Sequence, residues 1–304
     1  MEHDFHNWLR NHTSIQGLEK SVLLGIGDDG AILPESSSHT VVTTDTIAEG
    51  THFDTSIHSL EQIGRKAIAV NLSDIAAMGA TPTHAVLTLL MPRHFSLDDA
   101  KQLYSGIIQI ASNYNVAIIG GDTNRWDGKL VIGATVMGHR SPSISGWKLD
   151  GAQTADRVVV SGSFGGSING HHLSFEPRVE LANYLAGRYE IHAATDVSDS
   201  LSLDLQLLAR ASDVGVDIEA EKIPISNRLK ATNSPTPLDG ALYDGEDFEL
   251  ILTIAPAVFE RIKLDTDVPC QLTDIGEITP KEQGLRILDR HGNPNTLIPR
   301  GYIH

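Results

Sequence analysis

The residues best suited to chemistry lie in short acidic corners, where an aspartate stands beside glycine, serine or threonine. One corner, Thr43-Thr44-Asp45-Thr46, follows the strand-like Val41-Val42. The others contain Asp29, Asp74, Asp122, and the pair Asp196 and Asp199. Any one of them could be an ordinary turn or helix cap. Most follow or end an apolar run, however, so we expect their carboxylates at the ends of elements around one cleft.

Carboxylates gathered in one cleft repel each other strongly unless a cation lies among them. Aspartate and threonine oxygens are hard ligands that suit Mg²⁺, which bridges to substrate phosphates. Two or more Mg²⁺ ions could hold a triphosphate and align an in-line attack on it. An acceptor that is itself a phosphate needs no strong general base, because its second pKa is about 6. The corners therefore predict metal-dependent phosphoryl transfer.

Other phosphate-binding and catalytic motifs are missing. The chain has no glycine-rich loop ending in lysine and serine or threonine, and no protein-kinase signature. The loop 162–166 (GSFGG) does not match the dinucleotide fingerprint, and we interpret it as a tight turn. No Ser-His-Asp or Cys-His arrangement follows from spacing alone.

Two further side chains are candidates for substrate contacts. His52 follows the Asp45 corner, and Gly50 lets the chain bend back toward it; a lone histidine is otherwise a surface residue. Glu246 precedes the predicted strand 249–254, where a residue facing a ligand and a solvated turn are equally compatible with the sequence.

Composition limits the classes of partner. The 304 residues correspond to about two domains. A net charge of −16 argues against nucleic-acid and acidic-membrane partners, which are bound by clustered lysine and arginine. The single cysteine, Cys270, excludes an intrachain disulfide. The amino terminus lacks a signal-peptide pattern, and the apolar runs are too short to span a bilayer, so we expect a cytoplasmic protein.

Alternating strand and helix patterns predict an α/β (α+β) protein. In the first half we expect helices over 3–11 and 60–80, the second carrying Asp74 on it or in a break and stopping near Gly79. A further helix should start at Ser96 and bury Leu103, Ile107, Ile110 and Tyr114. Strands are predicted over 41–45, 85–91, 116–119 and 130–137, the third ending in Gly120-Gly121-Asp122.

The pattern dissolves over 139–156, which we interpret as the connection between two domains, 1–148 and 149–304. The first would be an α/β domain that binds ATP and magnesium, and the second another α/β domain. In the second half we expect a helix over 199–212 with Leu201, Leu205 and Leu208 facing inward. Strands are predicted over 157–161, 216–218, 249–254 and 271–278.

Together these motifs resemble the thiamine-monophosphate kinase family. The resemblance rests on residues 25–29 (GIGDD), 43–46 (TTDT), 50–53 (GTHF), 66–80 (KAIAVNLSDIAAMGA) and 119–123 (IGGDT). The second half adds 196–199 (DVSD) and 245–250 (GEDFEL). It spans most of the chain, and the run 66–80 is highly specific.

The resemblance implies a fold and a reaction. The family is similar to aminoimidazole ribonucleotide synthetase and selenophosphate synthetase, which use ATP with several Mg²⁺ ions. By this likeness the amino-terminal domain would pair with its copy in a homodimer through a β-barrel, with the active site in the adjoining cleft. The reaction would transfer the ATP γ-phosphoryl group to thiamine monophosphate, giving thiamine diphosphate.

The resemblance also implies residue roles. Metal ligands would be Asp29, Thr43, Thr44, Asp45, Asp74, Asp122, Asp196 and Asp199, with Asp45, Asp74 and Asp122 as the catalytic set. ATP contacts would be Tyr104, Gly121, Asp122, Lys148 and Ser198. Contacts to the thiamine phosphate would be His52, Glu246 and Tyr302.

The chain departs from the family pattern at three places. Lys148-Leu149-Asp150 stands where the family usually has an arginine, and lysine lacks the planar fork of arginine. Ser200 replaces a glycine, which would penalise a positive φ. Pro299 stands where an aromatic residue is expected, leaving Tyr302 as the nearest substitute.

Two alternatives to the kinase remain open. One is another ATP- and Mg²⁺-dependent enzyme of the same superfamily that acts on a different small phosphorylated substrate. The other is a non-catalytic nucleotide-binding paralogue, disfavoured because every metal-type aspartate is present.

Overall fold

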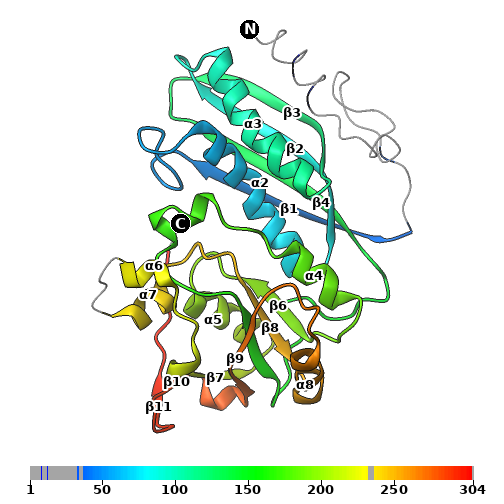
Figure 1. Cartoon of the computed structure of the whole chain (residues 1–304), viewed down its shortest axis with the longest axis vertical. Coiled ribbons are helices and arrows are strands. Elements are labelled where there is room, and N and C mark those ends of the chain that lie inside the picture. The colour runs from blue at the N-terminus through cyan, green and yellow to red at the C-terminus, as the bar shows by residue number, and fades with distance from the viewer. Residues whose placement is uncertain (1–7, 9–11, 13–32, 34–36, 232–235, 303–304) are drawn as a thin grey trace. The chain divides into compact units, whose positions relative to one another are not determined.

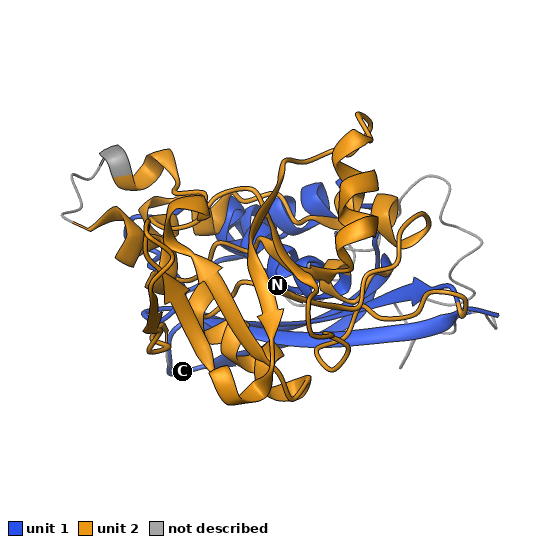
Figure 2. Ribbon diagram, turned by 90° about the horizontal axis from the view of Figure 1, so that it is seen from below, with its two compact units in different colours: residues 1–75, 81–141 blue, residues 76–80, 142–304 orange. Residues whose placement is uncertain are grey.

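The chain divides into two compact units in a computed structural model that describes residues 8, 12, 33, 37–231 and 236–302. Unit 1 comprises residues 1–75 and 81–141, and unit 2 comprises residues 76–80 and 142–304 (Figure 2). The division between 141 and 142 falls inside the stretch predicted as a connection, and a boundary after residue 148 stays a prediction. Asp29 and most of the predicted helix 3–11 lie outside the described residues.

Unit 1 contains a four-stranded sheet in the order β1-β4-β2-β3. The strands are β1 (His39–Ala48), β2 (Thr81–Pro92), β3 (Ala117–Trp126) and β4 (Val131–Arg140). β4 pairs antiparallel with β1 and β2, whereas β2 and β3 are parallel because helix α3 (Leu97–Asn113) crosses over between them. All four strands were predicted, with shorter bounds.

Helices α2 (Leu60–Ala77) and α3 (Leu97–Asn113) cover one face of this sheet (Figure 1). The predicted start of α3 is confirmed, because Ser96 and Asp99 form a reciprocal capping box. Leu103, Ile107 and Ile110 are buried, as the spacing predicts, whereas Tyr114 follows the last residue of α3 and is only half-buried. α2 is continuous through Asp74, so the alternative of a break there is wrong.

β3 continues beyond the predicted end of its strand. Gly120, Gly121 and Asp122 lie within β3, which stays paired with β2 as far as Trp126. A register shift at Ala85/Val86 leaves Ile119 unpaired. The parallel partner strand supports a stretch whose own sequence resembles a turn.

Unit 2 contains a seven-stranded sheet in the order β11-β10-β7-β9-β5-β8-β6. Its strands are β5 (Arg157–Ser161), β6 (Ala193–Asp196), β7 (Gly215–Glu219), β8 (Leu250–Ile254), β9 (Leu272–Thr279), β10 (Leu285–Leu288) and β11 (Pro294–Thr296). Its helices are α4 (Val179–Ala186), α5 (Leu201–Ala211), α6 (Asn227–Ala231), α7 (Pro237–Tyr243) and α8 (Pro256–Leu264). Short 3₁₀ turns occur at Ser167–Asn169, His171–Leu173, Ala220–Lys222 and Lys281–Gln283.

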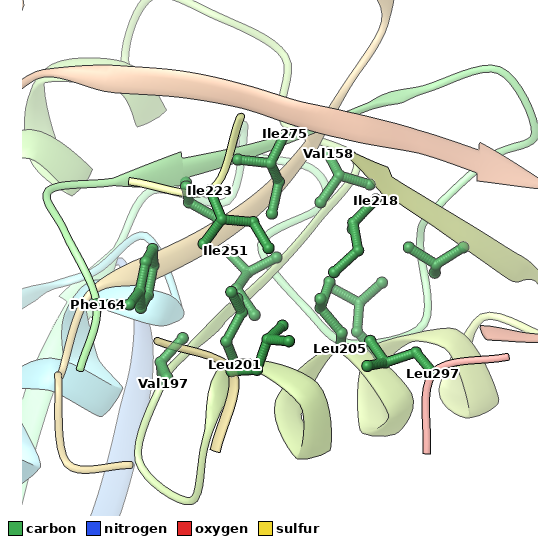
Figure 3. Close-up of a cluster of buried hydrophobic side chains, with 14 of the residues drawn as sticks. Val158, Phe164, Val197, Leu201, Leu205, Ile218, Ile223, Ile251, Ile275 and Leu297 are labelled. Carbon is green, nitrogen blue, oxygen red and sulfur yellow. The ribbon is translucent and has the colours of Figure 1, made fainter. Parts of the chain in front are cut away.

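The core of unit 2 forms between α5 and this sheet. Leu201 and Leu205 of α5 lie toward Val158, Ile218 and Ile251 of the strands (Figure 3). The predicted inward leucines and the predicted β5, β7, β8 and β9 are therefore confirmed.

Several elements of unit 2 were not predicted, among them α4, β6, α8, β10 and β11. β6 reads Ala-Ala-Thr-Asp, and alanine and aspartate are depleted in strands. The strand is held by its pairing with β8 and by the hydrogen bond that the Ala194 amide donates to the Lys148 carbonyl oxygen at 3.0 Å. Among the described residues, none of the helices combines the length and the apolar character required to cross a membrane.

Two glycines let α2 and α3 approach closely, which yields a prediction. A Cβ added at Gly106 would lie 1.9 Å from the Glu61 carbonyl oxygen, and one at Gly64 would lie 2.0 Å from that of Leu103. We expect Gly106→Ala to separate the helices and lower the free energy of unfolding by about 3 kcal/mol, measured by urea unfolding.

Gly187→Ala is the control, because Gly187 ends α4 at φ −85° and only the Asn183 carbonyl oxygen, at 4.0 Å, faces the added Cβ. There alanine should be neutral or stabilise by about 0.5 kcal/mol. An equal loss at both positions would contradict the close helix approach.

Candidate active site

The Asp45 and Asp74 carboxyl groups meet on the helix-covered face of the unit 1 sheet. Thr43 and Asp45 point to that face because side chains alternate along β1. The Thr43 hydroxyl donates a hydrogen bond to Asp74 Oδ2 on α2, and the Asp45 and Asp74 carboxyl groups hydrogen-bond to each other. Three predicted metal ligands, two from β1 and one from α2, thus form one cluster.

This cluster carries unfavourable negative charge. Burial and the neighbouring Asp74 carboxylate raise the pKa of Asp45 to about 7. Burial likewise raises the pKa of Asp74, although the hydrogen bonds from Thr43 and Asp45 oppose the shift. Two carboxyl groups in contact therefore retain a shared proton at neutral pH unless a bound cation takes the place of that proton.

The donor set fits a hard divalent cation. Carboxylate and hydroxyl oxygens are the ligands Mg²⁺ prefers. One helical turn before Asp74, the amide oxygen of Asn71 is buried without a hydrogen-bond partner among the described residues, which is costly for a polar atom. No group of three or more histidine, cysteine, aspartate or glutamate residues that could hold a metal occurs in the described part of the chain. Asp29 lies outside the described residues.

A tight turn after β1 carries His52. Gly50 has φ +87°, a left-handed backbone conformation that favours glycine, as expected for the bend predicted there. The Ala48 amide donates to His52 Nδ1 at 3.0 Å, so a neutral His52 ring carries its proton on Nε2. The fully buried Lys66 donates from Nζ to the His52 carbonyl oxygen at 2.9 Å.

The structure does not bring Asp122 to the Asp45–Asp74 pair. Across the sheet, Asp122 of β3 pairs with Thr88 of β2, Thr88 pairs with Gly133 of β4, and Gly133 pairs with Thr46 of β1. These four residues form one row. This row belongs to the face opposite Asp45, and β1 and β3 are the two edges of the sheet. The Asp122 carboxylate accepts hydrogen bonds from the Thr123 amide and the Asn124 side chain. Its metal role stays a prediction.

Three other predicted residues of unit 1 have different surroundings. The Thr44 hydroxyl points to the opposite face and donates to the Ala134 carbonyl oxygen at 3.1 Å. Tyr104 is buried in α3, and burial raises the pKa of its phenol. Gly121 lies within β3, where a Cβ would be 2.2 Å from the Leu87 carbonyl oxygen. Their roles in metal and ATP binding stay predictions.

The main chain of residues 197–199 brings together the candidates of unit 2. The Glu246 amide donates to the Ser198 carbonyl oxygen at 2.8 Å, and the Tyr302 amide donates to that of Asp199 at 3.1 Å. Asp196 ends β6 immediately before this stretch and is 7% exposed. Three segments that are far apart in sequence therefore meet here, and they carry Ser198 and Asp199, Glu246, and Tyr302.

Glu246 occupies an unusual backbone conformation. Gly245, Glu246 and Phe248 have φ values of +73°, +53° and +52°. Left-handed backbone at residues other than glycine is uncommon and concentrates at functional sites. A ligand-facing role for Glu246 stays a prediction.

Two buried aspartates that sequence reasoning missed support this cluster. Asp204 Oδ2 accepts from the Asp199 and Ser200 amides, each at 3.2 Å, and burial raises the pKa of Asp204 to about 7. Asp247 accepts from the Gly165 amide and the Ser167 hydroxyl in the glycine-rich loop. A signal existed for Asp204, because it falls on the same helical face as Leu201, Leu205 and Leu208.

The Ser200 and Lys148 departures have different consequences. Ser200 has φ 172°, which is extended backbone that any residue adopts, so the expected penalty against serine does not arise. The ammonium group of Lys148 lies 3.2 Å from the Asp150 carboxylate, a pair in which both side chains are more than half exposed. A role for Lys148 in nucleotide binding stays a prediction.

Sequence and structure comparisons agree with this arrangement. Residues 27–139 match the AIR synthase related protein, N-terminal domain, and residues 143–288 match its C-terminal domain. Fold and site therefore define a two-domain protein of the AIR synthase related class.

Whole-length relatives then specify the family. Thiamine-monophosphate kinase from Rhodopirellula baltica is 40% identical over 100% of this chain and 97% of its own length. The crystal structure of thiamine-monophosphate kinase from Stenotrophomonas maltophilia has a TM-score of 0.80 and 34% identity, covering 92% of this chain and 94% of that one. AaThiL complexed with AMPPCP and TMP has a TM-score of 0.76 and 28% identity, covering 92% and 91%. The chain belongs to the thiamine-monophosphate kinase family, which confirms the resemblance and the two-domain fold.

The carboxyl pair predicts that Asp45→Asn stabilises the metal-free protein at neutral pH. The amide cannot ionise, so its repulsion with the Asp74 carboxylate disappears. Each unit by which the pKa of Asp45 is raised corresponds to about 1.4 kcal/mol of folding free energy that the variant no longer loses. In chelator at pH 7.5 we expect the variant to melt a few °C above the wild type in differential scanning calorimetry. Mg²⁺ should raise the melting temperature of the wild type more than that of the variant. A Mg²⁺ response of equal size in both proteins would contradict the assignment.

The same pair predicts a pH dependence. Its carboxyl groups bind protons more tightly when folded, so the free energy of unfolding is largest at acid pH and falls as pH rises from about 4 to about 7. Asp204 and Asp247, whose burial raises their pKa to about 7 and about 6, act in the same direction. The difference between wild type and Asp45→Asn isolates the pair. We expect that difference, followed by calorimetry in chelator, to be smallest near pH 4 and to grow toward pH 7; a constant difference would be the contrary result.

Proposed function

We propose that this protein transfers the γ-phosphoryl group of ATP to thiamine monophosphate, giving thiamine diphosphate and ADP. The observation that carries the proposal is 40% identity to a thiamine-monophosphate kinase over the whole chain, combined with the Asp45–Asp74 pair. The similar AaThiL was solved with AMPPCP and TMP, which supports ATP and thiamine monophosphate as the two substrates.

Asp45 and Asp74, with Thr43, would hold Mg²⁺ in unit 1. Asp29, Thr44 and Asp122 are further proposed ligands there, and Asp196 and Asp199 are those of unit 2. When bound, Mg²⁺ neutralises phosphate charge and acts as a Lewis acid. The contribution of the chain is to keep these carboxylates fixed before substrate binds, which is the protein's main task in phosphoryl transfer.

The acceptor would be bound by His52, Glu246 and Tyr302. His52 receives the Ala48 N–H at Nδ1, so its Nε2–H is the group that can donate to a phosphate oxygen. No strong base is required, because the acceptor phosphate is largely ionised at neutral pH. Tyr104, Gly121, Asp122, Lys148 and Ser198 are the proposed ATP contacts.

We further propose a cytoplasmic homodimer that pairs through unit 1. In support, the β1 part of the sheet face opposite α2 and α3 carries uncharged side chains, and no described element of unit 1 covers it. Thr44 and Thr46 are exposed there, and Val42 is 59% exposed. An uncovered sheet face of this kind fits burial against a second copy.

A direct assay tests the proposed function. Purified protein with ATP, Mg²⁺ and thiamine monophosphate should yield thiamine diphosphate and ADP in equal amounts, measured by chromatography. Asp45→Asn should lose at least about 100-fold in turnover, the scale of losing one preorganised electrostatic group. Asp98→Asn, whose side chain is 88% exposed on α3, should retain full activity.

The alternatives give different results. ADP formed only with another small phosphate would indicate a different member of the superfamily. ATP binding without turnover of any such acceptor would indicate a non-catalytic paralogue. Either outcome overturns the proposed reaction.

A further inference from the structure

The carboxyl-terminal segment 299–302 is fastened to the start of α5 by two serine hydroxyls. Ser200 Oγ donates to the Arg300 carbonyl oxygen at 2.6 Å, and Ser202 Oγ donates to the same oxygen at 2.8 Å. The Arg300 amide donates back to Ser202 Oγ at 3.1 Å. Both serines are fully buried, so these bonds form away from competing water.

The segment also approaches the candidate site closely. A Cβ at Gly301 would lie 2.6 Å from the Asp199 carbonyl oxygen and 2.7 Å from Ser200 Oγ, so only glycine fits there. The next residue, Tyr302, donates its amide to that Asp199 oxygen and keeps its side chain 39% exposed. Tyr302 is therefore held beside Asp199 by main-chain contacts, while part of its side chain stays accessible.

Ser200 couples this segment to the helix that carries the site. Its hydroxyl accepts from the Leu203 amide at 3.1 Å, which caps α5, and donates to Arg300 at the same time. A hydroxyl can do both, whereas the glycine usual in the family can do neither. Upstream, Leu297 is buried in the unit 2 core near Leu205 (Figure 3), so the segment is anchored on both sides of Pro299.

We propose that Ser200 and Ser202 are positioning residues that hold residues 300–302 against Asp199, so that Tyr302 forms a wall of the acceptor site. The inference rests on the proposed function. It explains how this chain places an aromatic side chain although Pro299 occupies the expected aromatic position. The serines act through Tyr302, so their loss should affect the acceptor and leave ATP unaffected.

The test compares Ser200→Gly/Ser202→Ala with Ser212→Ala. Ser212 is the matched control, because at the other end of α5 its hydroxyl donates to the Leu149 carbonyl oxygen at 2.6 Å and accepts from the Ala152 amide. We expect the double variant to raise KM for thiamine monophosphate about tenfold, the loss of about 1.4 kcal/mol, with kcat and KM for ATP within twofold. Ser212→Ala should leave both KM values unchanged. Ser202→Thr, which keeps the hydroxyl, should retain the wild-type KM.

Hydrogen exchange separates this inference from the proposed function. The Arg300 and Tyr302 amides should exchange faster in the double variant and not in Ser212→Ala, whether or not the protein turns over thiamine monophosphate. Unchanged exchange would overturn the positioning role. Faster exchange with an unchanged acceptor KM would overturn the acceptor wall. If the wild-type protein does not turn over thiamine monophosphate, the proposed function and the acceptor wall are both overturned. Hydrogen exchange of the Arg300 and Tyr302 amides would still show whether the serines hold the segment.

Discussion

The site in unit 1 depends on one electrostatic constraint, the close approach of the Asp45 and Asp74 carboxyl groups. β1 presents Asp45 and Thr43 on one face, and α2 presents Asp74 to them. Fold stability alone would not select two half-buried acids in contact, because their burial raises both pKa values and opposes ionisation at neutral pH. The arrangement becomes favourable when a divalent cation is bound, which is why metal binding, stability and the proposed activity are linked in this protein.

In unit 2 the candidate site depends instead on hydrogen bonds that fix the main chain of residues 197–199. Residues 197–199 accept hydrogen bonds from Glu246, Phe248 and Tyr302 through their carbonyl groups, while the buried Asp204 receives the Asp199 amide. Glu246 and Phe248 belong to the turn with left-handed backbone, Tyr302 to the carboxyl-terminal segment, and Asp204 to the first turns of α5. Each contact is modest by itself. Together they hold Asp196, Ser198 and Asp199 in place without using the side chains proposed to bind ligands.

Strong periodicity made much of this fold predictable. The capping box of α3 and the inward leucines of α5 are local patterns, and the structure reproduces them. Long-range effects were not predictable. The face occupied by Asp122 depends on an irregular β2–β3 register, which leaves no sequence signature. Ser200 is a second example. From the sequence we expected only a penalty for a positive φ, but the Ser200 hydroxyl makes two hydrogen bonds, to partners that sequence spacing could not identify. The family motifs indicated residue types for the site, and the three-dimensional pairing decided which of them meet.

The most direct measurement is the position of a bound metal. Mn²⁺ prefers the same oxygen ligands as Mg²⁺ and scatters anomalously, so a crystal of the wild-type protein grown with Mn²⁺ would locate the site. An anomalous peak about 2 Å from a carboxylate oxygen of Asp45 and of Asp74 is the predicted result. The contrary result would be Mn²⁺ bound elsewhere, with these two carboxyl groups still hydrogen-bonded to each other.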